Sequence, residues 1–134
     1  MMRSLIRPRP LPPLGSSGVV ALEYAIILPA LILLIIGTMD VGRVLWVQVT
    51  LDRAVQAAAR CASVNTALCS SPAATQTFAV SQSWGMTPQA SVFTVTAPAC
   101  GNQVAAAMPF TYVIPVLKGS SYTIHSRACY PVIS

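Results

Sequence analysis

The feature that most constrains this chain is an uninterrupted apolar stretch close to its N-terminus. Residues 19–39 read VVALEYAIILPALILLIIGTM, which is 21 residues with a single formal charge, on Glu23. At about 1.5 Å per residue, a helix of this length reaches about 30 Å and matches the hydrocarbon thickness of a bilayer. Because a backbone in lipid must satisfy its own hydrogen bonds, the stretch is predicted to be a transmembrane helix, bent at Pro29.

The charges on the two sides of this stretch predict its orientation. Residues 1–18 carry three arginines and no acid, whereas Asp40 and Arg43 offset each other just beyond the stretch. The three arginines are Arg3, Arg7 and Arg9. Lys and Arg beside a span favour the cytoplasm. We therefore expect a single-pass inner-membrane protein with a cytoplasmic basic leader over residues 1–18 and a periplasmic domain over residues 40–134.

The composition agrees with a chain that is partly embedded in lipid. Only 8% of its residues are charged, against about 25% in an average soluble domain. The net charge of +5 falls to +2 without the leader arginines, since five bases and three acids are left. The positive net charge of the chain therefore comes mainly from the leader arginines. The chain has no Lys/Arg-rich stripe beside stacking aromatics, so we expect no nucleic-acid partner.

A cleaved secretory signal peptide is the competing interpretation of the apolar stretch. The apolar region of such a peptide is usually about 7–15 residues long and ends at a small-residue cleavage site. Here the stretch is longer, and GTMDVGRV follows it without an A-x-A pattern. Removal of the whole stretch on export is therefore disfavoured.

Glu23 is the unusual residue of the stretch, because a lone carboxylate inside lipid costs about 2.5–3.5 kcal/mol. It lies four residues beyond Val19, so a place near the cytoplasmic interface would lower that cost. The neighbouring residues favour a functional role instead. Residues 18–24 read GVVALEY, or G-x-x-x-x-E-Y, behind a basic leader and directly before the apolar stretch.

This pattern resembles the prepilin-peptidase site of type IV pilins, in the branch of the Flp and Tad pseudopilins. The resemblance implies cleavage between Gly18 and Val19, which makes Glu23 the fifth residue of the mature chain. It also marks Glu23 and Tyr24 as the assembly segment, in which Glu23 would pair with the Val19 ammonium of a neighbouring subunit.

The wider stretch GVVALEYAIILPALILLIIGTMDVGRVLW resembles the TadE-like family. There, a span with a central proline is followed by an acid-x-G-R segment, which residues 40–43 (DVGR) match. The resemblance is strong over residues 18–60 and weak beyond them. It implies a minor pilin or pseudopilin of a tight-adherence (Flp/Tad) pilus system, with a structural role in pilus biogenesis and cell adhesion.

The partners implied by this resemblance are the prepilin peptidase, other Tad pseudopilins, the Flp pilin and the inner-membrane pilus platform. Two alternatives remain open. One is a single-pass anchor with a periplasmic domain that is never processed, and the other is a pseudopilin of a type II secretion system.

The rest of the chain predicts an α+β fold in which the first helix continues into a pilin-like head. Apolar spacing near 3.6 carries that helix to about Asn65, with an alanine-rich face that packs either on the head or on another subunit. Ser71 and Pro72 are typical of a helix start and predict a second helix over residues 72–84, capped by Gly85.

Alternating residues then predict a small antiparallel sheet beside the long helix, with strands at residues 91–96, 110–114 and 122–129. Pro109 and Pro115 flank the middle run and favour an edge or a short strand there.

Four cysteines, Cys61, Cys69, Cys100 and Cys129, all follow the apolar stretch. Outside the cytoplasm they are expected to form disulfides, and the absence of C-x-x-C spacing disfavours zinc. Of the three pairings, Cys61–Cys69 with Cys100–Cys129 is favoured, and the others remain open.

No catalytic constellation is evident. His125, the single histidine, lies in a strand pattern, and the chain has no phosphate-binding glycine loop. We therefore expect neither an enzyme nor a cofactor.

Overall fold

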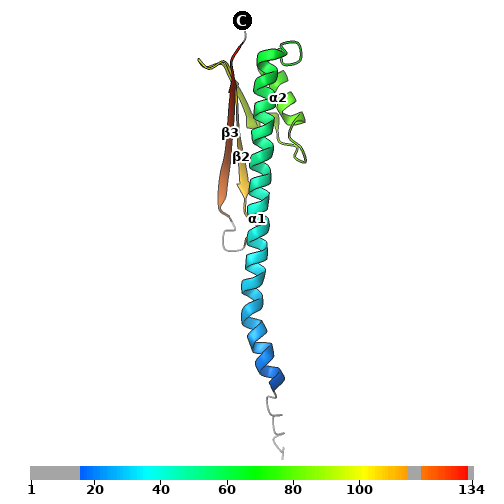
Figure 1. The fold of residues 1–134 in the computed structure, drawn as a ribbon, viewed down its shortest axis with the longest axis vertical. Coiled ribbons are helices and arrows are strands. Elements are labelled where there is room, and N and C mark those ends of the chain that lie inside the picture. The colour runs from blue at the N-terminus through cyan, green and yellow to red at the C-terminus, as the bar shows by residue number, and fades with distance from the viewer. Residues whose placement is uncertain (1–15, 115–118, 133–134) are drawn as a thin grey trace, which may run out of the picture. The chain divides into compact units, whose positions relative to one another are not determined.

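The computed structural model describes residues 16–114 and 119–132. The helices are α1 (Ser16–Val64) and α2 (Pro72–Ser81), and a short 3₁₀ helix, η1, spans Ala90–Val92. The strands are β1 (Phe93–Thr96), β2 (Asn102–Thr111) and β3 (Ser121–Tyr130) (Figure 1). A long N-terminal apolar helix, a short second helix and a three-stranded antiparallel sheet make the predicted α+β fold.

The chain divides into two compact units, Met1–Ile35 and Ile36–Ser134. In the first unit, α1 runs through Pro29 without interruption. The side chains of residues 19–35 are all exposed. Among the described residues, this one helix is long and apolar enough to cross a membrane, which agrees with a single-pass protein. Leader residues 1–15 lie outside the described residues.

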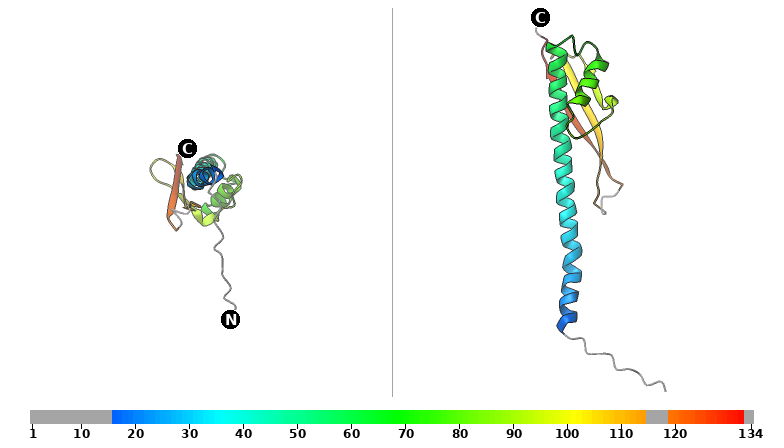
Figure 2. Two further views of the ribbon diagram at one scale, coloured as in Figure 1. Left: turned by 90° about the horizontal axis from the view of Figure 1, so that it is seen from below. Right: turned by 90° about the vertical axis from the view of Figure 1, so that its right-hand side faces the viewer.

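The second unit builds its core where the C-terminal half of α1 meets the sheet and α2 (Figure 2). The alanine-rich face of α1 takes part in this core, since Ala54, Ala58 and Ala59 are fully buried. Small side chains let the helix lie close to its neighbours. The larger core residues come from α1 and from all three strands, and they are Leu51, Val55, Phe93, Val104, Phe110 and Ile124. The alanine face therefore packs on the head of the same chain.

β2 is the centre of the sheet, whose order is β1-β2-β3 with antiparallel pairing throughout. The prediction of a middle strand over residues 110–114 was wrong in its bounds, because β2 begins eight residues earlier and ends at Thr111. Its first seven residues, NQVAAAM, are poor in β-branched residues and form a strand because β3 pairs with all of them and β1 pairs with residues 103–106. Pro109 is tolerated because it lies past Ala106, the last residue that pairs with β1.

α2 and β1 also differ from the prediction, each at one end, and β3 is one residue longer at both ends. α2 ends at Ser81 instead of residue 84, and Gln82 caps it through backbone hydrogen bonds to the last turn. Gly85 instead takes a left-handed φ of 73° in the following turn. The 3₁₀ helix occupies the first part of the strand predicted at 91–96, so β1 begins only at Phe93.

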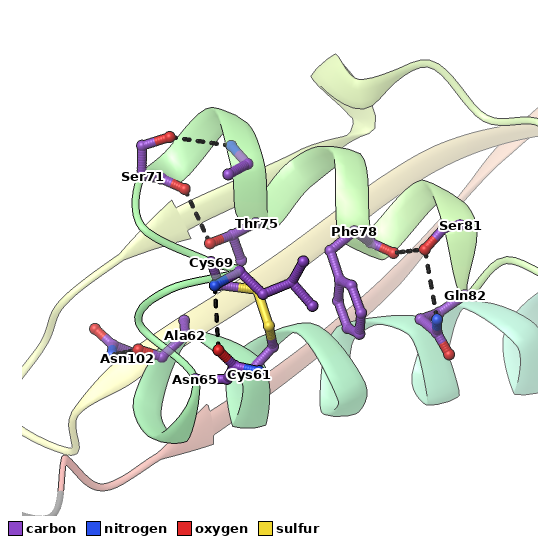
Figure 3. The surroundings of a disulfide bond; sticks show 12 residues. Cys61, Ala62, Asn65, Cys69, Ser71, Thr75, Phe78, Ser81, Gln82 and Asn102 are labelled. Atoms are coloured by element: carbon purple, nitrogen blue, oxygen red, sulfur yellow. Dashed lines mark hydrogen bonds between the residues drawn. A yellow bond between two sulfur atoms is a disulfide. The ribbon is translucent and has the colours of Figure 1, made fainter.

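Two disulfides join cysteines that follow the apolar stretch. Cys61–Cys69 closes a loop of sequence separation 8 after α1 (Figure 3), and Cys100–Cys129 has a separation of 29 and links the β1–β2 turn to β3. Both pairings are those favoured from the sequence. Next to the first bridge, Asn102 Nδ2 donates a hydrogen bond of 2.8 Å to the Ala62 carbonyl oxygen, so the start of β2 is attached to the end of α1.

Candidate processing and assembly segment

The predicted cleavage site lies at the start of α1. The helix begins at Ser16, so Gly18 is its third residue and the Gly18–Val19 peptide bond belongs to the first turn. Both residues are exposed. The bond is thus reachable from solvent, but it is held in a helical turn and not in an extended segment.

Glu23 and Tyr24 follow one turn later on the same helix. Both side chains are exposed, and Tyr24 keeps 67% of its surface. Val19 and Glu23 are four residues apart, so they lie on one helix face at neighbouring positions. Both residues therefore lie on one exposed face of α1. The predicted pairing joins Glu23 to the Val19 ammonium of another, cleaved subunit, and it stays a prediction.

A second site, missed by the sequence reasoning, lies at Asp40 in the second unit. The residue is 2% exposed, and its Oδ2 accepts hydrogen bonds from the backbone N–H groups of Val113 at 2.8 Å and Ile114 at 2.9 Å. Its Oδ1 accepts a hydrogen bond of 2.9 Å from Arg43 Nη1. The Arg43 guanidinium also lies 5.1 Å from the centre of the Phe110 ring. The acid-x-G-R segment thus ties α1 to the segment that directly follows β2.

The environment of Asp40 keeps its carboxyl ionised. Burial alone would raise the pKa of Asp40, but the N–H groups of Ile114 and Val113 and the Arg43 side chain outweigh it and lower the pKa below its ordinary value of 3.8. The only sequence signal for this role was the acid-x-G-R match, because the partner N–H groups belong to a backbone more than 70 residues away.

Asp52 attaches α1 to β3 in a similar way. Its carboxylate accepts hydrogen bonds from the Ser126 hydroxyl and from Gln48 Nε2, the latter at 3.1 Å. Gln48 Nε2 also lies 3.3 Å from the His125 carbonyl oxygen. Ser126 is buried whereas His125 is exposed, so successive residues of β3 point to opposite faces. This Asp–Ser contact therefore joins a helix to a strand, and the imidazole does not take part in it.

Residues 18–60 match the family model described as TadE-like protein. The chain carries a TadE-like segment. No curated protein and no solved structure matches the chain. The match confirms the resemblance found over the same residues in the sequence.

The TadE-like segment lies entirely within α1 and contains both sites described above. Gly18, Glu23 and Tyr24 lie at its start, and Asp40 and Arg43 lie near its middle. The sheet and α2 fall outside the matched residues, although Asp40 is hydrogen-bonded to the segment that follows β2. Within the described part of the chain, no three His, Cys, Asp or Glu residues gather in an arrangement suited to a metal ion.

Proposed function

We propose that this chain is a minor pilin or pseudopilin of a tight-adherence (Flp/Tad) pilus system, with a structural role in pilus biogenesis. The observation that carries the proposal is the TadE-like match over residues 18–60, which begins at Gly18 and includes Glu23 and Tyr24. An exposed apolar helix joined to a small disulfide-bonded head supports it.

In this proposal a prepilin peptidase cleaves after Gly18 and leaves a free ammonium group on Val19. Cleavage also removes the three leader arginines, so that the apolar helix can leave the inner membrane for an assembly of Tad pseudopilins and Flp pilin on the membrane platform. Glu23 then pairs with the Val19 ammonium of a neighbouring subunit, and the opposite charge offsets the cost of burying its carboxylate.

Mass spectrometry of the full chain, purified from membranes after co-expression with a prepilin peptidase, tests the cleavage step. The expected product begins at Val19. Gly18→Val should block cleavage, because bulk at the scissile bond hinders the approach of the peptidase. Gly42→Ala is the control, since an added Cβ there meets nothing within 4 Å and processing should proceed. A chain that still starts at Met1 beside active peptidase contradicts the proposal.

Glu23→Gln tests the assembly step separately. This change keeps the shape of the side chain and removes its charge, so cleavage should continue while recovery in the sheared pilus fraction or the pseudopilin complex falls. If the Glu23→Gln variant is recovered as well as the unchanged chain, the proposed pairing of Glu23 is wrong. The proposed cleavage step is not affected by that result.

One observation favours a second candidate, the unprocessed single-pass anchor. The Gly18–Val19 bond lies in the first turn of α1, and that turn must open before a peptidase can bind the chain in an extended form. The same mass measurement separates the two candidates, because the anchor keeps its leader arginines.

A further inference from the structure

Both tryptophans of the chain line one cavity of the second unit, and neither belongs to the buried core. Trp46 of α1 is 59% exposed, and Trp84, in the turn after α2, is 75% exposed. The cavity has a volume of about 320 Å³, and its other lining residues are Val49, Thr50, Arg53, Ala57 and Gln82. We call this cavity between α1 and the turn after α2 the tryptophan pocket.

The tryptophan pocket has the size and the walls of a site for a small ligand. Such sites begin at about 300 Å³ and combine mostly apolar walls with a few polar groups. Gly85 allows the turn to approach α1, since an added Cβ there would lie 3.5 Å from Trp46 Cζ2. A second cavity, of about 690 Å³, also includes Trp46. A ligand bound in the pocket can therefore continue past Trp46 along the surface of the head.

The charge of the tryptophan pocket is positive. Arg53 is exposed and has no ion pair among the residues that the structure describes. Asp52 precedes it in the sequence, but neighbouring residues of a helix do not face each other. The Asp52 carboxylate is instead hydrogen-bonded to Ser126 and Gln48. Arg53 is thus a free cation beside two indole rings, and it favours a ligand that carries negative charge.

The polar side-chain atoms of the tryptophan pocket are mostly hydrogen-bond donors. Arg53 has five N–H donors and each indole has one, and none of these side chains is hydrogen-bonded to a described residue. Among the lining side chains, only the Gln82 amide and the Thr50 hydroxyl can also accept. A peptide strand would bring backbone N–H groups for which the pocket has few acceptors. A ligand rich in oxygen acceptors fits the pocket better.

We propose that the tryptophan pocket binds an acidic oligosaccharide, with sugar rings against the two indoles and a carboxylate on Arg53. This inference goes beyond the assembly role and depends neither on leader cleavage nor on incorporation into a pilus. The C–H groups on one face of a sugar ring pack against the negative face of an aromatic ring. A guanidinium matches a carboxylate through two parallel hydrogen bonds. Sugar hydroxyls both donate and accept, and so suit Gln82 and Thr50.

Titration of the full chain with trigalacturonate tests the inference, with tryptophan fluorescence as the readout. The chain is held in phosphatidylcholine nanodiscs, because this lipid has no net charge and no sugar headgroup. Trp46→Phe and Trp84→Phe each leave one reporter, since the chain has only two tryptophans. The emission of both reporters should change with the same saturation curve. The methyl ester of trigalacturonate has the same rings without the charge, and it should bind at least tenfold more weakly.

Arg53→Gln and Arg60→Gln form a matched pair, since both arginines are exposed on α1 and only Arg53 lines the pocket. Arg53→Gln should weaken the binding of trigalacturonate about tenfold, because a charge-assisted hydrogen bond is lost. Arg60→Gln should leave the affinity unchanged. Trp84→Ala should weaken binding about fivefold relative to Trp84→Phe, which keeps an aromatic ring. Both Trp84 variants retain Trp46 as the reporter.

Equal losses of affinity in Arg53→Gln and Arg60→Gln would assign the binding to the general positive charge of the head and overturn the inference. Equal affinity for trigalacturonate and its methyl ester would overturn the role of the carboxylate. A chain that ignores trigalacturonate but responds to a helical peptide bearing glutamates would have a protein partner at this pocket, which also overturns the inference. None of these results changes the expected cleavage at Gly18, so the proposed assembly function is tested separately.

Discussion

Asp40 connects two parts of the head that are far apart in the sequence. One carboxylate oxygen accepts hydrogen bonds from two consecutive backbone N–H groups just after β2, and the other binds Arg43 on the next turn of α1. Buried polar groups are costly when unpaired, and here the acid and both amides are paired. The acid-x-G-R segment of the TadE-like match is therefore part of the folding of the head.

The stability of the head should depend on pH through Asp40. Its pKa in the folded head is lowered, so its contribution is complete above the ordinary pKa of 3.8 and is lost as the pH falls through the lower folded value. Asp40→Asn should lower the thermal midpoint at neutral pH and reduce the further loss on acidification. Thermal unfolding of the full chain in detergent, from neutral pH to about pH 3, measures the difference. Parallel curves for the two proteins would contradict this role.

Gly101 is the glycine whose replacement should be least tolerated. It has a φ of 119°, and an added Cβ would lie 2.1 Å from the Tyr130 carbonyl oxygen. The backbone conformation alone should cost Gly101→Ala about 1–3 kcal/mol. Hydrogen exchange of the β2 and β3 amides should therefore accelerate. Gly42→Ala is the control, because open space surrounds that helical position and alanine should stabilise the helix by about 0.5–1 kcal/mol.

The elements of the head are joined at three levels along α1. Asp40 is hydrogen-bonded to the segment after β2, and Gln48 and Asp52 are hydrogen-bonded to β3. Ser63 Oγ donates a hydrogen bond of 3.1 Å to the Tyr130 carbonyl oxygen. Alanines between these levels let the helix approach the sheet. Side-chain hydrogen bonds thus fix the position of the helix along the strands, where the alanine side chains offer little apolar contact area.

The two disulfides should stabilise the head unequally. In the loop-entropy account, a separation of 8 corresponds to about 2.5 kcal/mol and one of 29 to about 3.6 kcal/mol. The double variant Cys100→Ala/Cys129→Ala should therefore lose more stability than Cys61→Ala/Cys69→Ala. Urea unfolding of each variant in detergent gives the two losses. A larger loss of stability in Cys61→Ala/Cys69→Ala would contradict this order. It would mean that the buried packing of Cys61 and Cys69 contributes more than the difference in loop length.

The whole molecule is an apolar helical segment followed by a head with its own core. Both disulfides belong to the head, which agrees with a place outside the cytoplasm, and the leader arginines precede the helix. These features predict the orientation of the protein in a cell.

Protease added to spheroplasts should therefore digest the head and leave a protected fragment that contains residues 19–39. The two disulfides stabilise the folded head, so their reduction beforehand should speed its digestion. Immunoblotting against a tag after Ser134 follows the loss. A head that is digested only after the membrane is permeabilised would reverse the assigned orientation.

The local sequence pattern was sufficient to predict that the two α-helices exist. The apolar stretch, the 3.6 spacing beyond it and the Ser71–Pro72 start signal predicted α1 and α2, because helix formation depends on residues within a few positions of one another. The G-x-x-x-x-E-Y and acid-x-G-R patterns are equally local, and they predicted the TadE-like match.

The sheet and the role of Asp40 required the tertiary structure. The NQVAAAM run becomes strand only because β1 and β3 pair with it, and a strand prediction from alternation alone began at residue 110. Asp40 finds its partners 73 and 74 residues away, and Trp46 of α1 lies beside Gly85 only because the turn after α2 folds against the helix. The sequence by itself determined which secondary structure each segment favours. Long-range contacts decided which segments pair, because the energy of strand pairing depends on partner residues that are far away in the sequence.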